Sequence, residues 1–130
     1  MPRRLIPFIP ELHYHIYNRG NNRERIFFEP ENYLFFLKKI KQYLVPVADV
    51  LVYCLMPTHY HVVGRIKQTS EILKISEVLN SGVSAEVSSA MMKLSVSYTK
   101  AINKRFQRVG VLFFPLAEGE SILKIRHPSS

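Results

Sequence analysis

The fold is decided by residues 47–66, VADVLVYCLM-PT-HYHVVGRI. Residues 47–56 form a nearly continuous apolar run with β-branched side chains, which is typical of a strand that is covered on both faces. Pro57 and Thr58 make a tight connection, and residues 59–66 return as a second strand. The segment therefore predicts a β-hairpin.

The flanking segments predict further strands and helices. Residues 12–18 alternate apolar with polar side chains, as in a half-buried strand. An acidic, proline-containing start at 29–31 and apolar residues at helical spacing predict a helix that ends before Pro46. The longest helical pattern covers residues 84–106. Weaker signals predict a short helix over 73–79, a strand over 111–114 and a further strand over 122–125.

These elements follow one another in the order β-α-β-β-α-α-β. Strands that mix with helices and include one hairpin indicate an α+β sandwich, with an antiparallel sheet and helices on one face. A ferredoxin-like arrangement is the simplest member of that class. Because 130 residues provide room for one core, we expect a single domain over residues 1–130. Residues 1–10 form an extended basic arm in this interpretation, and residues 115–130 form an atypical tail.

The composition favours a polyanionic partner. Lys and Arg number 18 against 10 Asp and Glu, which gives a net charge of +8 and a pI of about 9.8. Such an excess on a small domain is typical of nucleic-acid binding, and a merely solvated basic surface is the alternative. The single cysteine, Cys54, excludes an intramolecular disulfide or a thiolate zinc cluster, and its apolar surroundings predict an inert buried thiol. The absence of a long apolar run or signal-peptide core predicts a cytoplasmic protein.

Two His-x-His pairs are candidate metal ligands. His59 and His61 fall on one face of the second hairpin strand, so both imidazoles could reach one ion. Imidazole suits Mn²⁺ and Zn²⁺ and contributes to Mg²⁺ sites. Such a pair alone is more often a coincidence than a site, and His13 and His15 have the same spacing. We favour His59 and His61 as the metal ligands, because they lie at the mouth of a hairpin, where a groove can open. His13 and His15 lie in the middle of a strand, and we expect them to have structural or stacking roles.

Tyr98 lies at the centre of the apolar stripe of the helix over 84–106. Periodicity alone identifies it as a core or interface residue. A tyrosine hydroxyl with its ordinary pKa near ~10 is a poor nucleophile unless a base or a metal-polarised phosphate assists it. Basic residues surround it in the sequence, a combination that fits a phosphate-bearing strand. These residues are Lys93, Lys100, Lys104, Arg105 and Arg108.

Three segments together resemble the HUH single-tyrosine transposases, in particular the REP-associated tyrosine transposase branch. They are Tyr14-His-Ile-Tyr-Asn-Arg-Gly20, Tyr53-Cys-Leu-Met-Pro-Thr-His-Tyr-His-Val-Val63 and Ser97-Tyr-Thr-Lys-Ala-Ile-Asn-Lys-Arg105. The middle segment is the most specific, because the family's hallmark is His-hydrophobic-His just after Leu-Met-Pro. The resemblance spans about residues 12 to 114.

The resemblance implies a ferredoxin-like fold, with Mg²⁺ or Mn²⁺ held by His59 and His61 on a central strand. It implies that Tyr98 attacks a phosphate of single-stranded or hairpin DNA, forming a 5′-phosphotyrosine and a free 3′-OH. Relatives often work as dimers. They carry Asn where this chain has Thr58, and they supply a third ligand about one turn after the tyrosine; Asn103 is the nearest amide here.

The leading hypothesis is therefore a metal-dependent DNA transposase or nickase, associated with the nucleoid. The alternatives are a non-catalytic nucleic-acid-binding module, as a decayed transposase copy would be, and a homodimer joined through the long helix. We expect DNA to contact amide and cationic side chains in the arm, the first strand and the long helix. These residues are Arg3, Arg4, Asn18, Arg19, Lys100, Lys104 and Arg105.

Overall fold

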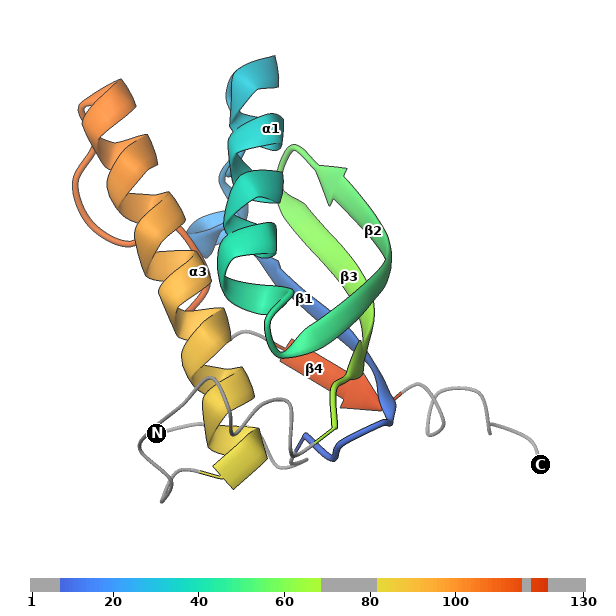
Figure 1. Cartoon of the computed structure of the whole chain (residues 1–130). Coiled ribbons are helices and arrows are strands. Elements are labelled where there is room, and N and C mark those ends of the chain that lie inside the picture. Colours follow the sequence, from blue (N-terminus) through green and yellow to red (C-terminus); the bar gives the residue numbers. More distant parts are fainter. Residues whose placement is uncertain (1–7, 69–81, 116–117, 122–130) are drawn as a thin grey trace.

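A computed structural model describes residues 8–68, 82–115 and 118–121. The strands are β1 (His13–Arg19), β2 (Ala48–Met56), β3 (His59–Ile66) and β4 (Glu118–Ser121). The helices are α1 (Pro30–Lys39), which a π-helical turn extends over Ile40–Leu44, and α3 (Gly82–Phe106), with a short 3-10 turn at Asn21–Arg23 (Figure 1). The short helix expected over 73–79 and the strand expected over 122–125 lie outside the described residues.

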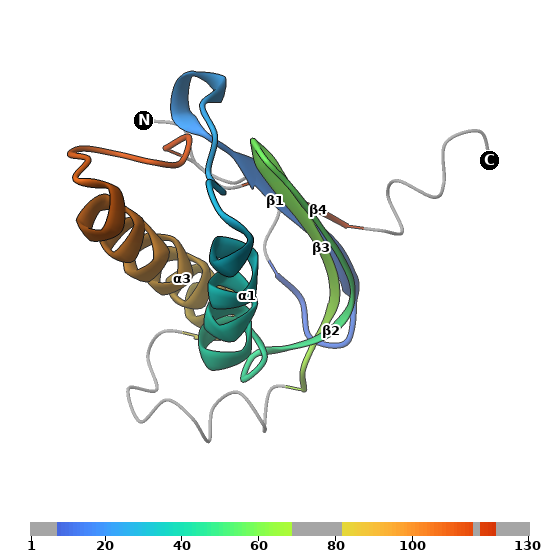
Figure 2. The same cartoon turned by 90° about the horizontal axis from the view of Figure 1, so that it is seen from above.

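The four strands form one antiparallel sheet in the order β2-β3-β1-β4. Along the chain the described elements follow the order β-α-β-β-α-β, and β3 separates β1 from β2. Both α1 and α3 cover the same face of the sheet and leave the other face open (Figure 2). This is the ferredoxin-like α+β sandwich that the sequence predicts.

The hairpin of β2 and β3 forms as expected, but β2 is not covered on both faces. Within the described sheet it is an end strand, and Leu51, Val52 and Tyr53 are more than half exposed. Cys54 is exposed as well, so the expected buried thiol is wrong. An apolar run indicates a strand without showing where in the sheet that strand lies. Here both helices cover one face of the sheet and leave the other face open.

The C-terminal part of the sheet also differs from the prediction. Residues 111–114 make only an isolated bridge, between Gly20 and Phe113, and Leu112 and Phe113 are buried in the core. The fourth strand is Glu118–Ser121, which pairs with β1. The apolar character of Leu112 and Phe113 therefore reflects core packing.

Aromatic side chains form the centre of the core between the sheet and the helices. Tyr98 of α3 is fully buried, with ring centroids 5.7 Å from Phe27 and 5.0 Å from Phe36. Its hydroxyl donates a 2.6 Å hydrogen bond to the carbonyl of Ile26. The backbone N–H groups of Ile26 and Phe27 in turn donate to the carbonyl of Pro57, at 2.8 and 3.2 Å. These bonds connect α3, through the segment before α1, to the turn of the hairpin.

No helix in the described part of the chain is long and apolar enough to cross a membrane.

The buried hydroxyl of Tyr98 should stabilise the fold measurably. Tyr98→Phe leaves the Ile26 carbonyl without its partner, which should lower the free energy of unfolding by about 1–3 kcal/mol in urea titrations. Tyr53→Phe removes the same atom from a half-exposed ring and should change that free energy by no more than about 0.5 kcal/mol. Equal effects of the two substitutions would contradict the structural role of the Tyr98 hydroxyl.

Candidate nucleic-acid and metal site

A cavity of about 790 Å³ opens on the sheet where β1 ends and β3 begins. We call it the histidine pocket. It is lined by Tyr17, Asn18, Arg19, Arg23, Thr58, His59, His61 and Phe114. It combines imidazoles, two guanidinium groups and aromatic rings, which are the side chains that bind phosphates and bases.

Strand register brings the pocket residues together. Tyr17 lies opposite His61 and Arg19 lies opposite His59 in the β1–β3 pair. Residues directly opposite each other in an antiparallel pair share a face, so all four side chains project from the open face of the sheet. Tyr60, between the two histidines, points to the other face and is buried in the core. The alternation that the sequence predicted for residues 59–61 is therefore present.

Both histidines have an oriented ring. Nδ1 of His61 lies 2.7 Å from Nε2 of His15, and Nδ1 of His59 lies 3.1 Å from the hydroxyl of Thr58. These bonds leave Nε2 of each ring as the nitrogen for a ligand. Metal-bound histidines are commonly held in this way through their second nitrogen. Thr58, directly before the first of the two histidines, thus has an orienting contact with it.

The spacing of the two rings suits one divalent cation. Two imidazoles that bind an ion at about 2.1 Å, roughly 90–110° apart, have ring centres about 4.6–5.3 Å apart. The ring centres of His59 and His61 are 5.1 Å apart. Burial first, and then the charges of His15 and His59, lower the pKa of His61, which favours the neutral imidazole that binds metals.

Within the part of the chain that the structure describes, no group of three or more His, Cys, Asp or Glu side chains could hold a metal ion. A cation at His59 and His61 would therefore need water or phosphate oxygens for the rest of its coordination shell. Mg²⁺ and Mn²⁺ accept such oxygen-rich shells. The donor set fits a site that is shared with a substrate rather than a closed structural site.

Asn103, the amide nearest to Tyr98 in the sequence, is hydrogen-bonded at the end of α3. Its Nδ2 donates to the carbonyl of Gly110 at 2.9 Å, and its Oδ1 accepts from the guanidinium of Arg108. It lies near the C-terminal end of α3, a helix that covers one face of the sheet. Both polar ends of the Asn103 amide thus contact the segment that follows the helix.

Tyr98 is not brought together with His59 and His61. It lies on the helix side of the sheet, whereas the two histidines project from the open side. Burial, and after it the neighbouring Tyr33, raise the pKa of Tyr98 far above its ordinary value. The position agrees with the core role that helical periodicity alone assigned to this residue, and not with attack on a phosphate bound at the histidines.

The expected DNA contacts fall into separate places. Arg19 lines the histidine pocket, with its guanidinium 4.4 Å from the ring centre of Phe114. Asn18 is buried, where it donates to the Phe114 carbonyl at 3.2 Å and accepts from the N–H of Arg19 at 2.8 Å. Lys100 and Lys104 are exposed on α3, and Arg105 forms an ion pair with Glu29. Arg3 and Arg4 lie outside the described residues.

Sequence reasoning missed several residues that line the histidine pocket or stack on its lining. His15 stacks on Tyr17, with ring centres 4.6 Å apart, and also on His61, at 4.9 Å. The alternation of residues 12–18 placed His15 and Tyr17 on one face, so that signal was present, but the pairing of this face with His61 depends on register. Arg23, in the 3-10 turn, and Phe114 carry no local signal for the pocket.

Comparison with known proteins identifies the fold. No protein-family model and no curated protein matches the chain. A solved structure of a REP-associated tyrosine transposase bound to a REP hairpin matches with a TM-score of 0.64 and 12% sequence identity. The match covers 98% of this chain and 68% of that one. At this identity the likeness is one of fold: the chain has the α+β fold of that transposase structure.

Proposed function

We propose that the chain binds single-stranded or hairpin DNA in the histidine pocket, together with Mg²⁺ or Mn²⁺ held by His59 and His61. The observation that carries the proposal is the convergence of these histidines with Tyr17 and Arg19 on an open sheet face. The structural neighbour was solved with a DNA hairpin, which supports the choice of partner. The net charge of +8 supports it further.

The pocket residues divide the work of binding. Arg19 and Arg23 supply guanidinium groups for phosphate oxygens. The ring of Tyr17, which stacks on His15, offers an aromatic surface to an unpaired base. A cation at His59 and His61 would neutralise phosphate charge. Thr58 and His15 hold the two histidine rings in the orientation that this requires.

Strand cleavage by Tyr98 is the second candidate function, and it rests on the resemblance to the tyrosine transposases. Attack would require the Tyr98 hydroxyl to leave the Ile26 carbonyl and the aromatic core and to reach the opposite face of the sheet. The geometry therefore favours DNA binding without a phosphotyrosine.

DNA binding should depend on the pocket arginine. In anisotropy titrations with a labelled DNA hairpin, log affinity should fall linearly with log salt, and Arg19→Ala should reduce that slope by about 1. Lys38→Ala removes one charge from an exposed position on α1 and should leave the slope nearly unchanged. A wild-type slope near zero would show that phosphate contacts do not drive binding.

Metal binding should depend on the second histidine pair. His59→Ala and His61→Ala should each weaken Mn²⁺ binding more than tenfold, and His15→Ala, which removes only an orienting contact, should weaken it by about tenfold. The loss of the free-Mn²⁺ signal in electron paramagnetic resonance measures binding directly. His13→Ala serves as the control. An equal loss from His13→Ala would exchange the roles of the two pairs.

Incubation with labelled hairpin DNA and Mn²⁺, followed by a denaturing gel, tests the catalytic alternative. The buried position of Tyr98 leads us to expect no covalent protein–DNA band from the wild-type chain. A band that forms with wild type and disappears in folded Tyr98→Phe would establish the transposase chemistry instead.

A further inference from the structure

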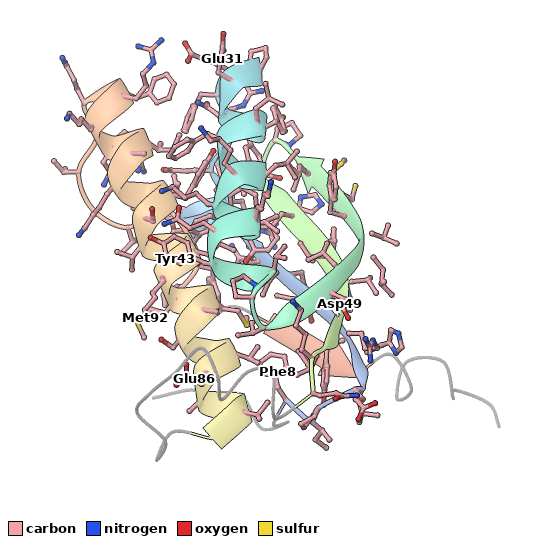
Figure 3. All side chains as sticks on the ribbon, in the orientation of Figure 1. Phe8, Glu31, Tyr43, Asp49, Glu86 and Met92 are labelled. Atoms are coloured by element: carbon pink, nitrogen blue, oxygen red, sulfur yellow. The ribbon has the colours of Figure 1, made fainter. Side chains whose placement is uncertain are left out.

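A second cavity, of about 550 Å³, lies between α3 and the segment 110–115. We call it the α3 groove. The segment leaves the end of α3 and runs back past the helix towards the sheet (Figure 1). The groove is mainly apolar, and its lining includes Met92 and Val96 of α3 and Val111 of the segment, which are 65%, 45% and 60% exposed. Figure 3 shows Met92 projecting from the helix away from the sheet.

The α3 groove adjoins the histidine pocket. Asn18 and Phe114 line both cavities, so they form the ridge between them. The ridge is fixed by hydrogen bonds: the N–H of Phe114 donates to the carbonyl of Arg19 at 2.8 Å, and Asn18 holds the Phe114 carbonyl. A polymer bound in the histidine pocket therefore has a preformed surface by which to continue into the groove.

One side of α3 beside the groove is basic. Lys93, Lys100 and Lys104 are exposed, and their spacing of seven and four residues places them on one side of the helix. At a rise of 1.5 Å per residue they span about 16 Å, the length of a few nucleotides. Glu86, near the start of the helix, is the single acidic residue of α3. Proteins bind single-stranded nucleic acids in basic grooves that offer aromatic rings to the bases. Lys100 and Phe114 supply both features to the lining of the α3 groove.

We propose that the α3 groove is a second DNA subsite, which receives unpaired bases of a strand that leaves the histidine pocket across Phe114. The phosphates of that strand would follow Lys100 and Lys104. This inference rests on the proposed function of the histidine pocket. A second copy of the chain is a poorer occupant, because it would bring another +8 of net charge to the same basic surface.

The test compares two labelled DNAs, a hairpin without flanks and the same hairpin with six unpaired nucleotides on each side. The wild-type chain should bind the flanked DNA about tenfold more tightly, as expected when one or two bases stack in the groove. Met92→Glu should abolish this gain and change the affinity for the unflanked hairpin less than about twofold. Leu34→Glu, at a 67% exposed position of α1, makes the same charge change and should keep the gain.

Three results would overturn the inference. The first is that the flanks give the wild-type chain no gain in affinity, the second is that the gain persists in Met92→Glu, and the third is that Leu34→Glu loses as much of the gain as Met92→Glu does. Light scattering that finds a dimer in wild type, lost in Met92→Glu, would also overturn it, because the groove would then hold a second copy. Failure of the proposed function is distinguished by the affinity for the unflanked hairpin. In that case the wild-type chain would not bind this hairpin, or Arg19→Ala would leave the affinity unchanged.

Discussion

The hydrogen bond from the Tyr98 hydroxyl to the Ile26 carbonyl is the contact on which the arrangement of this protein depends. The segment that contains Ile26 lies outside the helices and strands, so its buried backbone groups need partners from elsewhere. Tyr98 satisfies the carbonyl, while Pro57 accepts the N–H groups of Ile26 and Phe27. The next residue after Pro57 is Thr58, which orients His59. A side chain in the core thus fixes a turn that carries a metal-binding candidate on the opposite face of the sheet.

Local periodicity was sufficient to predict β1, β3, α1 and α3, because each has an apolar face that faces one core. It was also sufficient to place His59 and His61 on one face of a strand. It was insufficient for β2, whose apolar run indicated two covered faces although the strand lies at an end of the described sheet. Exposure of that kind depends on what packs above a strand, and this is a tertiary property that no local pattern records.

The candidate site shows the same division between local and long-range information. The bond between His15 and His61 joins residues 46 positions apart and follows from the register of β1 on β3. The role of Tyr98 shows the converse: its own helical stripe correctly indicated burial, whereas the resemblance to the transposases indicated a nucleophile. Asn103 was chosen by its proximity in sequence to the tyrosine, and its amide is used at the end of α3.

The open, apolar β2 has a consequence for the behaviour of the protein in solution. Its outer edge is unpaired in the described sheet, and its sequence, ADVLVYCLM, contains one charged residue. Such an edge is a template for strand addition by another chain, and natural proteins usually guard it with charge or proline. In this protein the protection does not come from β2 itself. The net charge of +8 on the whole chain makes two copies repel each other. High salt or a bound polyanion neutralises that repulsion, so colloidal stability should be poorest under the conditions in which the basic surface is occupied.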